Sequence, residues 1–119
     1  MHNDIRQWIT LIEARIYLTI YRGEYVGNRG GFFWTEDRDF ARQFTQSGQD
    51  REVLVRYIFP GDIYTQSSNV YAGDEAGVDA ALSAAKADGY KAIKLSEGPG
   101  EPHSLYVFDR SALMRSPPI

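Results

Sequence analysis

Apolar residues recur with two different periods near the start of the chain, and the change of period separates the first two predicted elements. Over residues 3–14 the spacing i, i+3, i+4, i+7 predicts a helix with one buried stripe, formed by Ile5, Trp8, Ile9 and Ile12. Over residues 15–21 apolar residues alternate with Tyr and Thr, which is typical of a strand with two different faces. This strand runs directly into Arg22.

The middle of the chain is divided by glycines and a proline. Four glycines within residues 23–31 predict a loop, and residues 32–35 form a short aromatic strand. A helix is predicted over roughly 37–45, capped by Thr35 or Asp37, with Phe40, Ala41 and Phe44 on its buried side. Residues 52–59 are rich in β-branched and aromatic side chains and predict a strand that ends at a Pro-Gly turn, before a further short strand at 62–65.

The last third of the chain contains the clearest helix. Residues 74–88 carry a narrow apolar face and end at Gly89, where a C-cap glycine is expected. Strands are predicted at 92–95 and 105–108, separated by a loop over 96–102, and residues 111–114 add a turn of helix. Because the strands come in pairs without a regular helix after each one, we expect an α+β fold. Residues 1–119 form one domain, with 115–119 as a flexible tail.

Composition excludes several classes of function. The formal net charge of −3 argues against general binding to nucleic acid or to a membrane surface. The absence of cysteine excludes disulfides and zinc–thiolate sites, and two isolated histidines predict no metal centre. No apolar run is long enough to span a membrane, and no signal peptide is visible. A cysteine-free chain suits any redox environment, so composition leaves the compartment open.

Arg22 is the first residue suited to chemistry. It ends an alternating strand, and a guanidinium held there could fork onto a diphosphate, while the glycine after it lets a ligand or a neighbouring backbone come close. The alternative is a structural ion pair with Glu24 or Glu36. Similarly, residues 32–35 offer flat rings beside the Thr35 hydroxyl for holding a planar heterocycle, or are simply a core strand.

The loop between the last two predicted strands contains two carboxylates, Glu97 and Glu101, and also His103. A carboxylate in such a loop could hydrogen-bond a ribose hydroxyl and stabilise an oxocarbenium ion as a bond to the sugar breaks. The alternative is a solvated acidic loop.

Taken in order, short segments of this chain resemble the ADP-ribosyltransferase-like superfamily, in the form of its compact bacterial and phage-type members. They are Ile20-Tyr21-Arg22-Gly23, Gly31-Phe32-Phe33-Trp34-Thr35, Phe40-Ala41-Arg42-Gln43-Phe44, Asp88-Gly89-Tyr90-Lys91-Ala92-Ile93 and Leu105-Tyr106-Val107-Phe108-Asp109. The resemblance implies mixed and antiparallel sheets split around an NAD-type cleft, with two or three helices. It also implies that the residues binding NAD, as substrate, are Arg22, Gly23, Phe33, Trp34, Thr35 and Phe44.

The catalytic residues that the resemblance implies are Arg22 and a glutamate at the start of a late strand. Ser104 stands directly before the last predicted strand, where the family has Glu, so Glu101 is the predicted catalytic carboxylate and Glu97 its alternative. The predicted function is an NAD-dependent ADP-ribosyltransferase, a bacterial or phage effector or toxin that modifies a macromolecule such as a protein. Such an effector is expected in the cytoplasm or delivered into a host cell. Two alternatives are a non-catalytic protein-binding inhibitor on the same scaffold and an NAD glycohydrolase.

Overall fold

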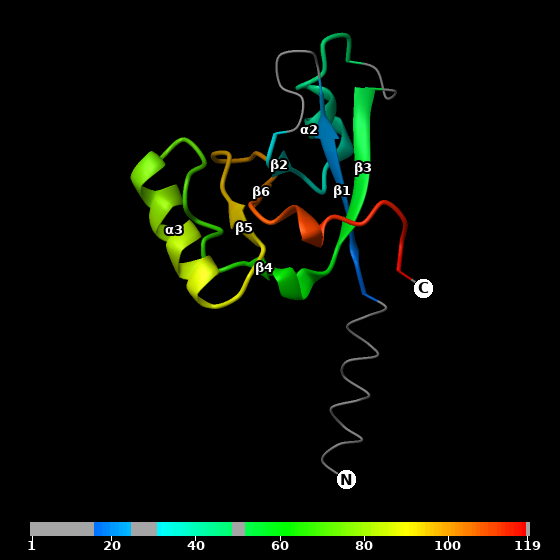
Figure 1. Cartoon of the computed structure of the whole chain (residues 1–119). Helices are drawn as coiled ribbons and strands as arrows, with labels where there is room; N and C mark the ends of the chain where they lie inside the picture. The colour runs from blue at the N-terminus through cyan, green and yellow to red at the C-terminus, as the bar shows by residue number, and fades with distance from the viewer. Residues whose placement is uncertain (1–15, 25–30, 49–51, 119) are drawn as a thin grey trace.

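The computed structural model describes residues 16–24, 31–48 and 52–118, and their strands divide into two sheets. The helix predicted over 3–14 and the centre of the glycine-rich loop lie outside the described residues. One sheet has two strands and the other has four, and two α-helices lie beside them (Figure 1). This arrangement confirms the α+β class and the mixture of parallel and antiparallel pairing.

The two-stranded sheet pairs β1 (Leu18–Gly23) with β3 (Val53–Ile58) in antiparallel register. The predicted alternation of β1 is visible in its burial, because Ile20 is fully buried and Arg22 is only 8% exposed. Side chains two residues apart on a strand share one face, so Ile20 and Arg22 point into the same interior. Arg22 therefore extends the inward-facing row of β1 rather than pointing to solvent.

The four-stranded sheet has the order β2-β6-β5-β4. Only the β4–β5 pair is parallel. A backbone bridge between Tyr21 and Thr35, with N–O distances of 2.7 and 2.9 Å, joins β1 to the end of β2 and so fixes one sheet against the other. The strands are β2 (Phe33–Trp34), β4 (Ile63–Tyr64), β5 (Ala92–Leu95) and β6 (Ser104–Val107).

The two α-helices begin at aspartate caps. Asp37 accepts a hydrogen bond from the Phe40 amide at 2.9 Å and starts α2 (Arg38–Arg42), which is shorter than the predicted helix. The Thr45 hydroxyl donates a hydrogen bond to the Arg42 carbonyl at 2.7 Å, next to the point where the helix ends after five residues. Helix α3 (Glu75–Ala87) matches its prediction closely and is followed by Gly89 with φ of +81°, the left-handed conformation expected after a helix.

Two apolar clusters hold these layers together. The larger cluster lies between the sheets and centres on Ile20, Ile58 and Val107, each at most 1% exposed. The smaller lies under α3, where Ala81 and Ala85 contact the four-stranded sheet. Short 3₁₀ turns at Pro60–Asp62 and Arg110–Ala112 complete the described elements. Within the described ranges no helix has the length and apolar character needed to cross a bilayer.

Candidate functional site

A cavity of about 440 Å³ lies where the two sheets, α2 and two loops meet. We call it the aromatic cavity, because rings from β1, β2, α2 and the loop before α3 line it. Its volume falls in the range of small-molecule sites. It brings together all six residues predicted to bind a dinucleotide, which are Arg22, Gly23, Phe33, Trp34, Thr35 and Phe44.

Arg22 lines the aromatic cavity and also makes one of the ion pairs considered for it from the sequence. Its Nε lies 3.4 Å from Oε2 of Glu24, and its Nη1 donates a hydrogen bond to the Phe33 carbonyl at 2.9 Å. The ion pair with Glu24 is therefore present, whereas no contact with Glu36 supports the other proposed pairing among the described residues. A guanidinium carries five N–H donors in a fixed plane, so these contacts hold it in place at the cavity wall.

Gly23 allows a neighbouring backbone, rather than only a ligand, to approach. A Cβ at this position would lie 2.0 Å from the Ala41 carbonyl oxygen and 3.1 Å from the Phe44 backbone. Helix α2 can therefore pack against the end of β1 only because residue 23 has no side chain. This close packing places Ala41 and Phe44 in the cavity wall.

Thr35 positions the cavity wall. Its hydroxyl donates to the His103 carbonyl at 3.1 Å and accepts from the Asp37 amide at 3.1 Å. One hydroxyl has one hydrogen and two lone pairs, so most of its hydrogen-bonding capacity is used within the protein. Thr35 thus ties β2 to the start of α2 and to the loop before β6.

Two buried polar atoms at the aromatic cavity have no hydrogen-bond partner among the described residues. They are the indole Nε1 of Trp34 and the hydroxyl of Ser104, which belong to residues only 5% and 3% exposed. The two residues lie on adjacent strands, because Trp34 pairs with Leu105 in the β2–β6 register. Burying an unpaired donor or hydroxyl costs about 1–3 kcal/mol, so each of these atoms would gain from a partner such as a water molecule or a ligand.

Large rings line the cavity with part of their surface open to solvent. Phe33, Phe44 and Tyr71 are 40%, 48% and 55% exposed. Phe44 meets the buried Phe40 edge to face, with ring centroids 5.2 Å apart. A Cβ on Gly73 would lie 2.5 Å from the Tyr71 ring, so this ring rests against the glycine. These partly open faces are suited to stacking on a planar heterocycle.

Of the two glutamates considered from the sequence, Glu97 lines the cavity that contains Arg22. Glu101 is exposed and is not part of the cavity lining. A bridge between Tyr71 and Ser96 explains the difference. The Ala72 amide donates to the Ser96 carbonyl at 2.8 Å, and the Ser96 amide donates to the Val70 carbonyl at 2.8 Å. Glu97 follows this anchored residue, whereas Glu101 lies beyond two glycines with positive φ.

Several cavity residues were not singled out by sequence reasoning. The stretch 71–73 reaches the cavity only through the pairing with Ser96, a contact with no local sequence signal. Ser104 was noted only as the residue standing where a glutamate was expected, and its buried position at the start of β6 places it in the wall. Both Ser104 and its neighbour Leu105 are buried, so the alternation of a strand gives no signal for the direction of the Ser104 side chain.

No protein-family model matches this chain, and neither does any curated protein. The chemistry available at the cavity is therefore defined by its own residues. They provide a buried guanidinium, flat apolar rings, an unpaired indole N–H, an unpaired hydroxyl and one carboxylate. This set can hold an anionic ligand that also carries a planar ring.

Proposed function

We propose that the aromatic cavity binds NAD and that the protein is an ADP-ribosyltransferase. The observation that carries this proposal is the convergence of all six residues implied by the family resemblance, together with Glu97, on one cavity. These residues come from stretches as far apart in sequence as β1 and the loop after β5, so chance proximity along the chain does not explain their meeting.

Each part of the dinucleotide has a complementary group in this cavity. Arg22 supplies positive charge for the diphosphate. Phe33 and Phe44 offer ring faces to the nicotinamide or the adenine. The Trp34 indole N–H and the Ser104 hydroxyl suit a carboxamide, which has a carbonyl acceptor and an NH₂ donor.

Glu97 is the proposed catalytic carboxylate in place of Glu101. In the reaction the bond between ribose C1′ and the nicotinamide nitrogen breaks, and its electron pair moves onto the ring nitrogen, which loses its positive charge. The ribose becomes an oxocarbenium ion, which the Glu97 carboxylate stabilises. A nucleophile of the acceptor then bonds to C1′ and loses a proton.

The macromolecular acceptor distinguishes this function from an NAD glycohydrolase, in which water attacks the same cation. A non-catalytic inhibitor on this scaffold would need no carboxylate beside Arg22. The presence of Glu97 in the cavity wall favours the enzyme over the inhibitor. A small effector of bacterial or phage origin remains the biological role most in keeping with this activity.

The proposal is tested by NAD binding, measured by calorimetry, and by nicotinamide release, followed by chromatography with a protein lysate as acceptor. We expect the wild type to bind NAD and release nicotinamide. Glu97→Gln should lower the rate of release by about 100-fold, because it removes the charge that stabilises the cation while leaving binding largely intact.

Glu101→Gln is the matched control, because it makes the same chemical change on an exposed residue outside the cavity. It should release nicotinamide at the wild-type rate. Absence of NAD binding by the wild type would overturn the proposal. Equal rates for Glu97→Gln and the wild type would overturn the role of Glu97, and loss of activity in Glu101→Gln alone would assign the reaction to Glu101.

A further inference from the structure

A second cavity, of about 260 Å³, shares two wall residues with the first but has a different chemical character. We call it the arginine hollow. Among the residues that the structure describes, four of the chain's thirteen basic residues line it, together with one acidic residue, Glu24. The basic residues are Arg22, Arg56, Arg110 and Arg115.

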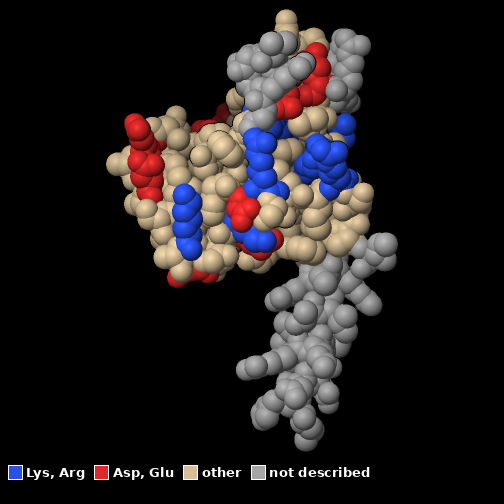
Figure 2. All heavy atoms as spheres, viewed as in Figure 1, with Lys and Arg blue, Asp and Glu red and all other residues tan. Residues whose placement is uncertain are grey.

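The arginine hollow and the whole protein carry net charges of opposite sign. Four arginines and one glutamate give the described part of its lining a formal charge of +3, whereas the complete chain carries −3. Figure 2 shows basic side chains gathered over the part of this face where β1, β3 and the C-terminal segment lie. Such a local concentration of one sign, in a protein of the opposite sign, raises the local concentration of small anions.

The remaining walls strengthen this electrostatic field. Leu54, Leu113 and Trp34 contribute apolar surface, and Gly31 contributes no side chain. A Cβ on Gly31 would lie 2.1 Å from Nη2 of Arg22, so the guanidinium packs directly against this glycine. Low-dielectric walls reduce screening, which makes each guanidinium more effective toward an anion than it would be on an open surface.

The four arginines are held by different elements. Arg22 lies on β1, and Arg56 on β3 has its Nη1 2.7 Å from the Val55 carbonyl oxygen. Arg110 begins the 3₁₀ turn Arg110–Ala112, and its guanidinium carbon lies 5.4 Å from the centroid of the Phe32 ring. Arg115 follows Met114, whose backbone bridges to Tyr57 on β3. The fold thus fixes the C-terminal segment so that its arginines reach the first sheet.

We propose that the arginine hollow is a second ligand site, for a phosphate-bearing anion. Arginine forks match the oxygens of phosphate in pairs of parallel hydrogen bonds. Four guanidinium groups around one hollow concentrate positive charge there, and this suits a group with several charged oxygens. The same chemistry has two sources, which are the diphosphate of a bound dinucleotide and a phosphate group on a different molecule.

The test is calorimetric titration of the full-length protein with inorganic pyrophosphate, at low and at physiological salt. We expect binding that weakens as salt rises. The triple variant Arg56→Gln, Arg110→Gln, Arg115→Gln should weaken it by about 10-fold or more, because it removes three of the four forks. Arg22 is left unchanged, since it also lines the aromatic cavity. Each single variant is measured as well, so the test does not depend on the folding of the triple.

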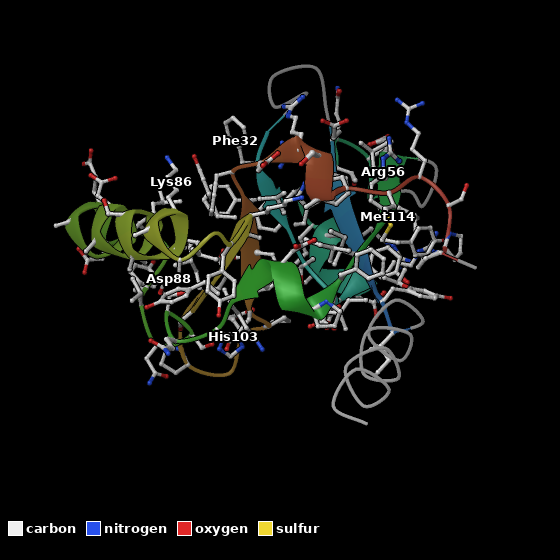
Figure 3. All side chains as sticks on the ribbon, turned by 60° about the horizontal axis from the view of Figure 1, so that its bottom comes forward. Phe32, Arg56, Lys86, Asp88, His103 and Met114 are labelled. Carbon is white, nitrogen blue, oxygen red and sulfur yellow. The ribbon has the colours of Figure 1, made fainter. Side chains whose placement is uncertain are left out.

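The matched control is Lys86→Gln, Lys91→Gln, Lys94→Gln, which removes the same amount of charge outside both cavities. Figure 3 shows Lys86 at the opposite end of the molecule from Arg56. This variant should bind pyrophosphate within about 3-fold of the wild type, because close contacts rather than net charge dominate binding. Three results would overturn the proposal: equally weakened pyrophosphate binding in both triple variants, no pyrophosphate binding by the wild type, or equally tight binding of the dicarboxylate malonate.

A second titration, with NAD in the presence of saturating pyrophosphate, distinguishes the two sources of phosphate. Competition, together with weaker NAD binding in the arginine triple variant, assigns the hollow to the dinucleotide diphosphate. Simultaneous binding assigns it to another phosphate-bearing molecule. The inference is also independent of the enzymatic one, because a wild type that binds pyrophosphate through these arginines but never binds NAD would retain the site and lose the proposed function.

Discussion

The aromatic cavity and the arginine hollow share Arg22 and Trp34 but surround them with opposite chemistry. In the first, rings and backbone from β2 and α2 accompany one carboxylate, Glu97. In the second, three further arginines accompany Glu24. The comparison shows that the role of Arg22 is set by its neighbours. A single buried guanidinium lines both cavities, and its neighbours in each differ in charge and shape.

The two sites also differ in how strongly they depend on exact backbone packing. The wall of the aromatic cavity requires α2 to touch β1 at Gly23, whereas the arginine hollow is lined by long side chains that can adjust. Variants that act on one site and spare the other therefore test whether the two sites are separate.

The largest effect is expected for Gly23→Ala. The added Cβ would meet the Ala41 carbonyl oxygen at 2.0 Å, and backbone on both sides leaves no room for local adjustment. We expect a loss of about 3 kcal/mol in the free energy of unfolding, measured by chemical denaturation. NAD binding should be lost with the displaced helix, while pyrophosphate binding persists in the folded fraction, because Gly23 lines only the aromatic cavity.

Gly61→Ala is the control for Gly23→Ala. Gly61 lies in the turn Pro60–Asp62, where no atom comes within 4 Å of an added Cβ. Its stability should stay within about 0.5 kcal/mol of the wild type. Similar losses for the two variants would show that the close approach of α2 to β1 is not what makes position 23 sensitive.

A smaller effect, acting on both sites at once, is expected for Arg22→Lys. Lysine keeps the charge but cannot reach Glu24 and the Phe33 carbonyl together, as the planar fork does. Because both groups of the pair are mostly buried, with side chains 9% and 19% exposed, we expect a loss of about 2 kcal/mol in stability. Affinities for NAD and for pyrophosphate should each fall by about 10-fold in titrations.

Arg42→Lys makes the same substitution in an exposed pair. Arg42 Nη1 lies 3.4 Å from Asp39 Oδ1, but the two side chains are 38% and 86% exposed. Its effect on stability should stay below about 0.5 kcal/mol, and neither ligand should bind differently. Unchanged binding of both ligands in Arg22→Lys would contradict the view that Arg22 anchors the two sites.

The sequence predicted most elements because local periodicity and turn residues determine them. The alternation of β1, the apolar face of α3 and the glycine after it are all encoded within a few residues. The aromatic cavity was also largely predictable, since six of its residues lie in short motifs of the resemblance: Arg22, Gly23, Phe33, Trp34, Thr35 and Phe44.

What escaped prediction depends on contacts between distant parts of the chain. The location of Glu97 in the wall of the aromatic cavity depends on the pairing of Tyr71 with Ser96, which no local pattern predicts. The arginine hollow joins residues 22, 56, 110 and 115, whose spacing has no motif. Helix α2 is shorter than predicted, and next to its end the Thr45 hydroxyl donates a hydrogen bond to the Arg42 carbonyl. Periodicity does not reveal this competition between side chain and backbone.

The smallest effect is expected for Trp34→Phe, which separates the two sites most finely. The substitution removes part of the ring, which costs packing, but it also removes the buried indole N–H that has no partner. Because the second effect partly offsets the first, stability should fall by only about 1 kcal/mol. Trp34 lines both sites, but the other unpaired atom, the Ser104 hydroxyl, belongs to a residue that lines only the aromatic cavity.

We therefore expect the indole N–H to serve the aromatic cavity. In calorimetric titrations of Trp34→Phe, NAD should bind about 5- to 10-fold more weakly, as expected for one lost hydrogen bond, and pyrophosphate should bind as it does to the wild type. Ser104→Ala should show the same pattern. The reverse pattern in Trp34→Phe, with weaker pyrophosphate and unchanged NAD, would move the indole N–H to the arginine hollow and leave the carboxamide without its proposed donor.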